Sequence, residues 1–226
     1  MDCCVYFRED SGMMVYLVLY VDDMLIASVS MSLIKDLKQK LKGEFDMKDL
    51  GPAKKILGMQ LHRDRKTGTL FLSQEDYIRR VIDKFGMANS KLVQTPLAPH
   101  FRLSDQLSPT TEAEKSEMVN VPYASAVGCL MYAMVLTRLD LSYAVSVVSR
   151  YMANPRKEHW RAVKWILRYL NRTTTYGLMY GGSRQDDSQI VGYVDSDYAG
   201  DLDIRRSLTG YLFTLNNCTV NWKAQL

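Results

Sequence analysis

Residues Val15 to Ala27 run Val-Tyr-Leu-Val-Leu-Tyr-Val-Asp-Asp-Met-Leu-Ile-Ala, and this stretch decides the fold. Two short apolar segments, Val15–Tyr20 and Met24–Ala27, are separated only by Val21-Asp22-Asp23. Apolar runs of this length, rich in Val, Ile, Leu and Tyr, predict buried strands, and the short gap predicts that they pair as a hairpin. The tip of that hairpin then carries two adjacent carboxylates.

The two carboxylates, Asp22 and Asp23, indicate either a metal site or a turn. Neighbouring carboxylates repel each other, and a shared cation relieves that repulsion. Mg²⁺ suits such a pair because it prefers a few carboxylates together with substrate phosphates. Asp is also a favoured turn residue, so a solvated turn is the alternative. From these residues alone both interpretations stay open.

The sequence after the hairpin alternates between helical and extended patterns. A helix is expected from Ser30 or Ser32 to Gly43, where apolar residues lie on one face and lysines on the other. A second hairpin is expected from 56–62 and 69–72, with a polar turn at Asp64–Gly68. Ser73 is the expected N-cap of a helix over Gln74–Phe85, which Gly86 ends.

The second half of the chain predicts a polar connection, three helices and then strands. Residues 88–121 contain three prolines and are expected to form a linker or loop, with a short helix near 112–118. Helices are expected over 122–137, 141–152 and 157–171, and strands over 177–180, 190–194, 208–215 and 219–222. A domain boundary is expected near Gly181–Ser188.

The third of these helices is strongly basic. Residues 156–172 hold six basic residues and one acid, a net of +5 that exceeds the +4 of the whole chain. At ~100° per residue the basic side chains form one stripe, with Trp165 on its flank; the stripe consists of Lys157, Arg161, Lys164, Arg168 and Arg172. Contact with a phosphate backbone, with Trp165 stacking on a base or sugar, is one interpretation. A solvated helix face is the other.

Acidic residues also follow the predicted strand at 190–194. Asp195-Ser196-Asp197 closes the strand, and Asp201 and Asp203 come soon after. A calcium loop is excluded because its fifth and twelfth positions would be Ala199 and Arg206. A strand that ends in Asp is typical of two-metal nucleases, whereas a polar turn explains the same residues without a function.

Composition narrows the class of protein. The chain has 226 residues, 47% of them hydrophobic and 24% charged, as in an ordinary globular protein. Its longest apolar run, Met13–Val21, is too short for a membrane helix, and no signal peptide is expected. Cys3, Cys4, Cys129 and Cys218 form no C-x-x-C pair, which argues against a zinc site or a disulfide framework and fits a reducing compartment.

Taken together, the motifs resemble one family. Tyr20-Val21-Asp22-Asp23 resembles the Y-V-D-D signature of reverse transcriptases, and further segments are similar to the Pol polyprotein of copia-type LTR retrotransposons. These segments are Leu50-Gly51-Pro52-Ala53, Leu57-Gly58-Met59, Tyr77-Ile78, Thr95-Pro96-Leu97, Tyr123–Gly128, Ser149–Met152, His159-Trp160, Ile166–Leu170, Gly192–Asp201, Arg206-Ser207 and Thr209-Gly210-Tyr211. The resemblance extends nearly from end to end.

The resemblance implies an RNA-directed DNA polymerase followed by RNase H. It implies that Asp22 and Asp23 are two of three palm carboxylates that hold Mg²⁺ (or Mn²⁺), and that Asp195 is the first RNase H carboxylate. The hairpin that contains Leu57, Gly58 and Met59 is similar to the element that supports the primer end. The implied partners are an RNA template, a primer or DNA duplex and dNTP, in the cytoplasm or a virus-like particle, with no membrane.

The fold class implied is α+β, in three parts. Residues 1–87 resemble the C-terminal part of a polymerase palm and the start of the thumb, 88–180 a helical thumb and connection region, and 181–226 the first strands of an RNase H-like domain. The family takes its third palm ligand from upstream of the hairpin, and its later RNase H ligands from beyond the third strand. We therefore expect the isolated chain neither to polymerise nor to cleave; the alternative is a non-catalytic nucleic-acid-binding remnant of a decayed element.

Overall fold

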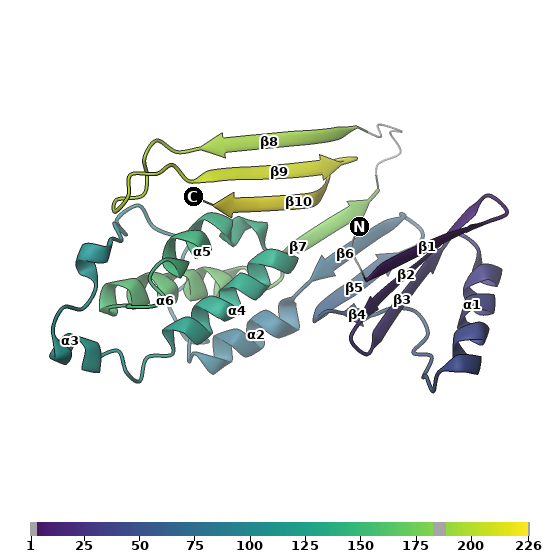
Figure 1. The fold of residues 1–226 in the computed structure, drawn as a ribbon, viewed down its shortest axis with the longest axis horizontal. Helices are drawn as coiled ribbons and strands as arrows, with labels where there is room; N and C mark the ends of the chain where they lie inside the picture. Colours follow the sequence, from purple (N-terminus) through teal and green to yellow (C-terminus); the bar gives the residue numbers. More distant parts are fainter. Residues whose placement is uncertain (1–3, 183–188, 226) are drawn as a thin grey trace. The chain divides into compact units, whose positions relative to one another are not determined.

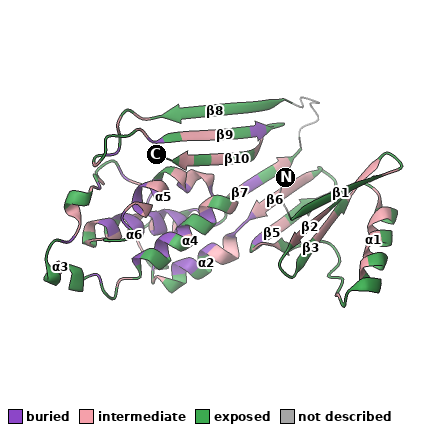
Figure 2. Cartoon of the chain, in the orientation of Figure 1, coloured by how far each residue is buried: buried purple, intermediate pink, exposed green. Residues whose placement is uncertain are grey.

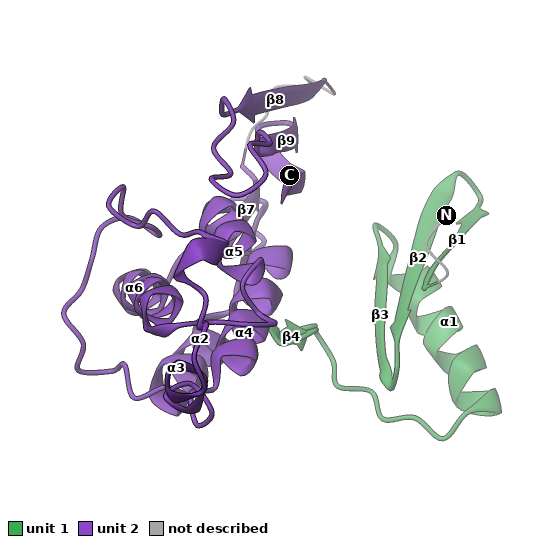
Figure 3. Cartoon of the chain, turned by 60° about the vertical axis from the view of Figure 1, so that its left-hand side comes forward, with its two compact units in different colours: residues 1–61 green, residues 62–226 purple. Residues whose placement is uncertain are grey.

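The computed structural model describes residues 4–182 and 189–225, which form a mixed α and β structure (Figure 1). The chain divides into two compact units, residues 1–61 and 62–226 (Figure 3). These units differ from the three parts expected from the family resemblance, whose boundaries at 87/88 and 180/181 stay a prediction. Residues 183–188, where the second boundary was expected, lie outside the described residues.

The first unit is built on a three-stranded antiparallel sheet of order β1-β2-β3, made of β1 (Val5–Asp10), β2 (Met13–Tyr20) and β3 (Asp23–Ser28). The predicted hairpin is β2–β3, with Tyr20 opposite Asp23. Strand β1 was not predicted, although Ser11-Gly12 is a turn signal: both residues have positive φ, 52° and 77°, as a two-residue hairpin loop requires.

Helix α1 (Met31–Glu44) follows β3 and packs along it. Ser30 is its N-cap, because the Ser30 side chain accepts a hydrogen bond from the Leu33 N–H. Of the two predicted caps, Ser30 is therefore the one used.

The expected strand over 56–62 is wrong in one respect, because a turn interrupts it. Strand β4 (Lys55–Ile56) pairs antiparallel with the start of β5 (Met59–Asp64), Ile56 opposite Met59. Leu57 and Gly58 form the turn, with φ of 52° and 71°. Gly58 tolerates this conformation without strain, and that favours a tight turn over continuous extension.

In the second unit the turn predicted at 64–68 is present. Strand β5 ends at Asp64 and β6 (Thr69–Ser73) begins after Gly68, whose φ is 70°. The Asp64 carboxylate accepts hydrogen bonds from the Lys66 N–H and the Thr67 hydroxyl, both at 2.8 Å. Strand β6 then pairs antiparallel with β7 (Gly177–Gly181).

Helix α2 (Glu75–Lys84) begins one residue later than predicted. Ser73 is the last residue of β6, so the N-cap is Gln74 and not Ser73. Gln74 is buried, and its side-chain oxygen accepts a hydrogen bond from the Thr137 hydroxyl at 2.7 Å, which ties the helix start to a distant segment. Gly86 ends the helix with φ of 64°, as predicted.

The helical core of the second unit consists of α4 (Tyr123–Leu136), α5 (Ser142–Ser149) and α6 (Lys157–Arg172), packed with α2 (Figure 2). All three helices were predicted. Their small residues, Ala126, Ala133, Ala144 and Ala162, are fully buried where the helices approach one another. Within the described ranges, no helix combines the length and the apolar character needed to cross a membrane.

The segment 88–121 is not a free linker. It contains a 3₁₀ turn, Asp105–Leu107, and the short helix α3 (Glu112–Ser116) that was predicted. Val93, Leu103 and Met118 from this segment are buried in the same core as α4, α5 and α6. Because these apolar residues follow no helical or strand period, the sequence did not predict that they pack.

A second antiparallel sheet completes this unit, with order β10-β9-β8. Its strands are β8 (Ile190–Ser196), β9 (Thr209–Leu215) and β10 (Cys218–Gln225). The Trp222 indole N–H donates to the Met134 carbonyl at 3.0 Å and so attaches β10 to α4. All of the strands expected after residue 173 are present.

Candidate functional sites

The two predicted palm carboxylates lie at the tip of the β2–β3 hairpin. Val21 and Asp22 form the two-residue loop, and Asp23 is the first residue of β3. Both carboxylates are exposed, and neither makes a hydrogen bond or ion pair with any described residue. They are therefore available as ligands.

The loop that presents them is strained. Val21 has φ of 52° and is 88% exposed. A β-branched residue in the left-handed region is an outlier, because its side chain crowds the backbone, and an Asn or Gly would avoid the cost. Strain of this kind, without a packing role for the side chain, is typical of functional loops.

The donor set fits a magnesium site in part. Exposed, unpaired carboxylates are the oxygen ligands that Mg²⁺ and Mn²⁺ take. Among the described residues, however, no group of three His, Cys, Asp or Glu side chains is close enough to hold an ion. Asp22 and Asp23 can thus supply two ligands, and a complete site needs a further one.

The proposed primer-support residues lie in the turn between β4 and β5. Leu57 and Gly58 are the turn residues, and Met59, which begins β5, is buried. They belong to the same unit as Asp22 and Asp23.

The acidic residues after β8 have different environments. Asp195, still in β8 and opposite Gly210, is exposed, and its carboxylate makes no hydrogen bond or ion pair with a described residue. It lines a pocket of about 380 Å³ that also contains Asp140, Asp197 and Lys223. Asp195 is therefore available for a ligand.

The other three carboxylates hold the loop 197–208 together. Asp197 accepts a hydrogen bond from the Leu208 N–H at 2.7 Å. Asp201 is buried and paired with Arg150 at 3.0 Å, and Asp203 accepts from the Ser104 hydroxyl at 2.7 Å. Their role in this structure is to bind the loop to the helical core.

The basic residues of α6 have unequal surroundings. Lys157 is paired with Glu117 at 2.8 Å, and Arg168 donates to the Lys91 carbonyl. Arg161 and Lys164 make no ion pair with any described residue. Arg172, at the end of the helix, is exposed.

Trp165 packs against the segment 88–121. Its indole N–H donates to the Thr95 carbonyl at 2.9 Å, and its ring meets His100 and Phe101 edge to face, with centroids 5.5 and 5.7 Å away. The Arg168 guanidinium lies 5.0 Å from the centroid of the same ring. The indole thus joins α6 to this segment.

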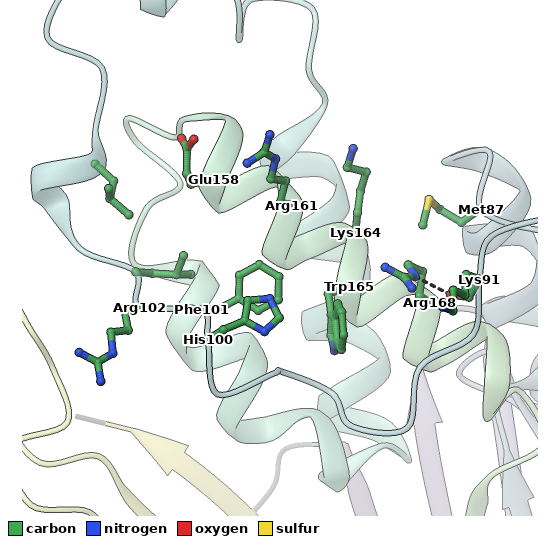
Figure 4. A pocket seen from close by; sticks show the side chains of 12 residues that line it. Met87, Lys91, His100, Phe101, Arg102, Glu158, Arg161, Lys164, Trp165 and Arg168 are labelled. Atoms are coloured by element: carbon green, nitrogen blue, oxygen red, sulfur yellow. Dashed lines mark hydrogen bonds between the residues drawn. The ribbon is translucent and has the colours of Figure 1, made fainter.

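A groove of about 780 Å³ lies where α6 faces residues 100–107. We call it the α6 groove. Figure 4 shows the rings of His100, Phe101 and Trp165 together, with Arg161 and Lys164 from α6 nearby. Its basic lining residues are Lys91, Arg102, Arg161, Lys164 and Arg168. The sequence did not predict Lys91, His100 and Arg102 as site residues. The spacing of residues in a polar segment does not show that the segment packs against a helix about 60 residues later in the chain.

Arg138 was not among the candidate site residues that the sequence predicted. It follows α4 and is almost fully buried, with hydrogen bonds to both oxygens of Asp140 and to Thr173. The Tyr169 hydroxyl donates to the same Asp140 carboxylate at 2.7 Å, and burial together with this bond raises the pKa of Tyr169 to about 12. This cluster is a structural connection between the ends of α4 and α6.

Comparison with known proteins agrees with these motifs. Residues 1–99 match the family model described as reverse transcriptase (RNA-dependent DNA polymerase). The Pol polyprotein of transposon TNT 1-94 from Nicotiana tabacum is 55% identical over 226 residues, which is 100% of this chain and 17% of the polyprotein. No solved structure is a significant match.

Two further relatives place the match in transposons of other organisms. A putative transposon Ty5-1 protein of Saccharomyces cerevisiae is 34% identical over 98% of this chain and 69% of that protein. The Pol polyprotein of transposon RE1 from Arabidopsis thaliana is 34% identical over 99% of this chain and 14% of the polyprotein. The chain therefore spans less than a fifth of the two polyproteins. These matches show that it belongs to the reverse transcriptase family of copia-type retrotransposon Pol polyproteins.

Proposed function

We propose that this chain supplies part of an RNA-directed DNA polymerase that works within a longer Pol polyprotein. Residues 1–87 would be the C-terminal part of the palm and the start of the thumb, 88–180 the thumb and connection, and 181–226 the first strands of an RNase H-like domain. The observation that carries the proposal is the exposed, unpaired Asp22 and Asp23 pair on a strained hairpin loop. Family membership supports it.

In this proposal Asp22 and Asp23 hold two of the ligand positions of Mg²⁺ (or Mn²⁺). The bound metal would act as a Lewis acid on the primer hydroxyl and the dNTP phosphates. The contribution of this chain is to fix both carboxylates at one point, since the two-residue loop leaves little freedom between them. The remaining ligand would come from another part of the polyprotein.

The other proposed site residues belong to the same three parts of the chain. Asp195 would be the first RNase H carboxylate, because it is exposed and unpaired at the end of β8, whereas its acidic neighbours are engaged. Leu57, Gly58 and Met59 would support the primer end. The basic residues of α6, with Trp165, would contact the template and primer, in the cytoplasm or in a particle.

A chimera tests the catalytic proposal. This chain would replace the aligned 226 residues of the tobacco polyprotein, to which it is 55% identical, and primer extension on an RNA template would be measured with Mg²⁺ or Mn²⁺. We expect template-directed synthesis by the chimera and its loss to background in Asp22→Asn or Asp23→Asn. The isolated 226-residue chain should show no synthesis.

The matched control is Asp46→Asn, an exposed carboxylate in the same unit that lies outside the hairpin. It should leave synthesis unchanged. If Asp22→Asn retains full synthesis in the chimera, Asp22 is not a metal ligand. If the isolated chain extends a primer and Asp22→Asn abolishes that activity, the chain is a complete polymerase and the proposed dependence on other segments is wrong.

A second candidate function is nucleic-acid binding without catalysis. The basic lining of the α6 groove favours it, because five basic residues gather there beside three aromatic rings. An inactive chimera that still binds RNA would support this second function over the first.

A further inference from the structure

We infer that the α6 groove binds one unpaired nucleic-acid strand, through its phosphates on one wall and a base against its aromatic residues. The inference rests on the nucleic-acid-binding part of the proposed function and identifies the site and the form of its ligand. It differs from the interpretation drawn from the sequence, in which the whole basic stripe of α6 contacts the backbone. Here residues 100–107 form the site together with α6.

The first argument is charge. Lys91, Arg102, Arg161, Lys164 and Arg168 line the groove, and Glu158 is the acid among the described lining residues. The side chains of Arg102, Arg161 and Lys164 make no hydrogen bond or ion pair with a described residue. Cations left without partners around a concave surface concentrate positive potential there, and this favours an anionic ligand.

The second argument is spacing. Arg161, Lys164 and Arg168 lie on one side of α6 and span seven residues, or about 10 Å at 1.5 Å per residue. A row of cations of this length can contact more than one phosphate of the same strand. Arg102, on the segment that packs against α6, also lines the groove and adds a positive charge to it.

The third argument is the aromatic lining. Trp165 is fixed by its hydrogen bond to Thr95 and by the edge-to-face contacts with His100 and Phe101. His100, by contrast, is exposed and lines the groove. A fixed ring cluster with one exposed member is a suitable platform for stacking a base, which costs little entropy because the rings are already ordered.

The fourth argument is size. A volume of about 780 Å³ is in the range of pockets that enclose a single small molecule. One or two nucleotides of an unpaired strand fit such a space with their bases inside. A duplex does not enter it in this way, because its paired bases are stacked inside the helix and leave no base face free to stack on the aromatic residues.

Fluorescence anisotropy with the full 226-residue chain tests the inference. The probe is a labelled oligouridine RNA of about 12 nucleotides, titrated at several salt concentrations, with the same length of RNA duplex as competitor. The groove variants are Arg102→Ala and the pair Arg161→Ala with Lys164→Ala. The control is Arg80→Ala, which removes the same charge from an exposed position on α2 that does not line the groove.

We expect both groove variants to weaken binding and Arg80→Ala to leave it unchanged. The slope of log affinity against log salt should fall by about 0.7 for Arg102→Ala and about 1.4 for the double variant. Glu158→Gln should strengthen binding, because it removes the negative charge from the groove. Photo-crosslinking with thiouridine should label His100, and circular dichroism checks that each variant is folded.

Three outcomes would overturn the inference. Binding that is unchanged in Arg102→Ala and in the double variant would place the ligand elsewhere on the chain. A duplex that competes better than the single strand would contradict the form of the ligand, and crosslinks that avoid residues 100–107 would contradict the position. None of these results affects the chimera experiment, so failure of the groove and failure of the polymerase proposal are distinguishable.

Discussion

Arg138 shows how one buried side chain holds several elements of the second unit. It is 1% exposed and donates to Asp140 at 3.0 and 2.7 Å, to the Thr173 carbonyl at 3.0 Å and to the Thr173 hydroxyl at 2.6 Å. A buried guanidinium is tolerated because each of these acceptors replaces a hydrogen bond to water. Loss of the side chain would leave these acceptors without their donor.

Arg138→Ala should lower the free energy of unfolding by about 3 kcal/mol, the scale for breaking a buried, hydrogen-bonded ion pair. Urea denaturation followed by circular dichroism measures this. Arg80→Ala, the same change on an exposed part of α2, should alter the free energy of unfolding by less than about 0.5 kcal/mol. Equal effects of the two substitutions would show that the buried cluster contributes no stability.

Asp201 makes a second buried polar cluster, and this one depends on pH. The residue is 3% exposed, and its carboxylate accepts the N–H groups of Asp203 at 2.7 Å and Ile204 at 3.1 Å and pairs with Arg150. Burial by itself would raise the pKa of Asp201. The backbone hydrogen bonds and the arginine outweigh burial, so the pKa lies below its usual 3.8.

A carboxylate with a lowered pKa stabilises the fold above its unfolded pKa, and that stabilisation is lost as the pH falls through the folded value. Asp201→Asn should therefore lower the free energy of unfolding by about 2 kcal/mol at neutral pH. The difference from the unsubstituted chain should shrink below about pH 4 and close as Asp201 protonates. Urea denaturation at a series of pH values measures it; a constant difference down to about pH 2 would contradict the assignment.

At the scale of the element, the β2–β3 hairpin combines regular pairing with an unfavourable loop. Its register is continuous from Val15 opposite Ser28 to Tyr20 opposite Asp23. The loop residue Val21 nevertheless has a φ that suits Gly or Asn. The strain lowers the stability of the hairpin at the loop that carries the two carboxylates. Such a cost in stability is typical of functional sites.

Val21→Gly should stabilise the hairpin by about 1 kcal/mol, because glycine takes positive φ without a steric cost. Amide hydrogen exchange in β2 and β3 of the full chain measures the change. Val21→Ala removes the β-branch but keeps Cβ and should give a smaller gain. Faster exchange in Val21→Gly than in the unsubstituted chain would show that the loop conformation is unstrained.

The segment 88–121 shows which features of its structure the local sequence predicts and which it does not. Its prolines and polar residues predicted a loop with one short helix, and both are present. Its packing was not predictable, because Val93 and Leu103 follow no period and their partners lie on α4 to α6. The groove residues His100 and Arg102 became visible only when this packing was known.

At the scale of the molecule, the two units have very different cores. The apolar cluster of the second unit runs from Ile78 to Leu170 and includes fully buried residues of α2, α4, α5 and α6. In the described part of the first unit, residues 4–61, the buried apolar side chains are Val15 and Met59. The free energy that burial can supply is therefore concentrated in residues 62–226.

Residues 62–226 expressed alone should fold cooperatively, because their core lies within that range. Residues 1–61 alone should not, since two buried apolar side chains cannot offset the conformational entropy of about 60 residues. Circular dichroism and thermal unfolding of the two pieces test this. A cooperative transition from residues 1–61 alone would contradict it.

The sequence by itself determined the α+β class, most helices and strands, the reverse transcriptase family, and the Asp22 and Asp23 pair at a hairpin tip. These follow from local patterns: periodicity, caps, turns and short motifs. The tertiary structure decided which polar residues are engaged and which are free. It buried Asp201 and Arg138, left Asp195 exposed, and placed His100 and Arg102 opposite the basic face of α6. Such contacts join residues far apart in the chain, and no local pattern encodes them.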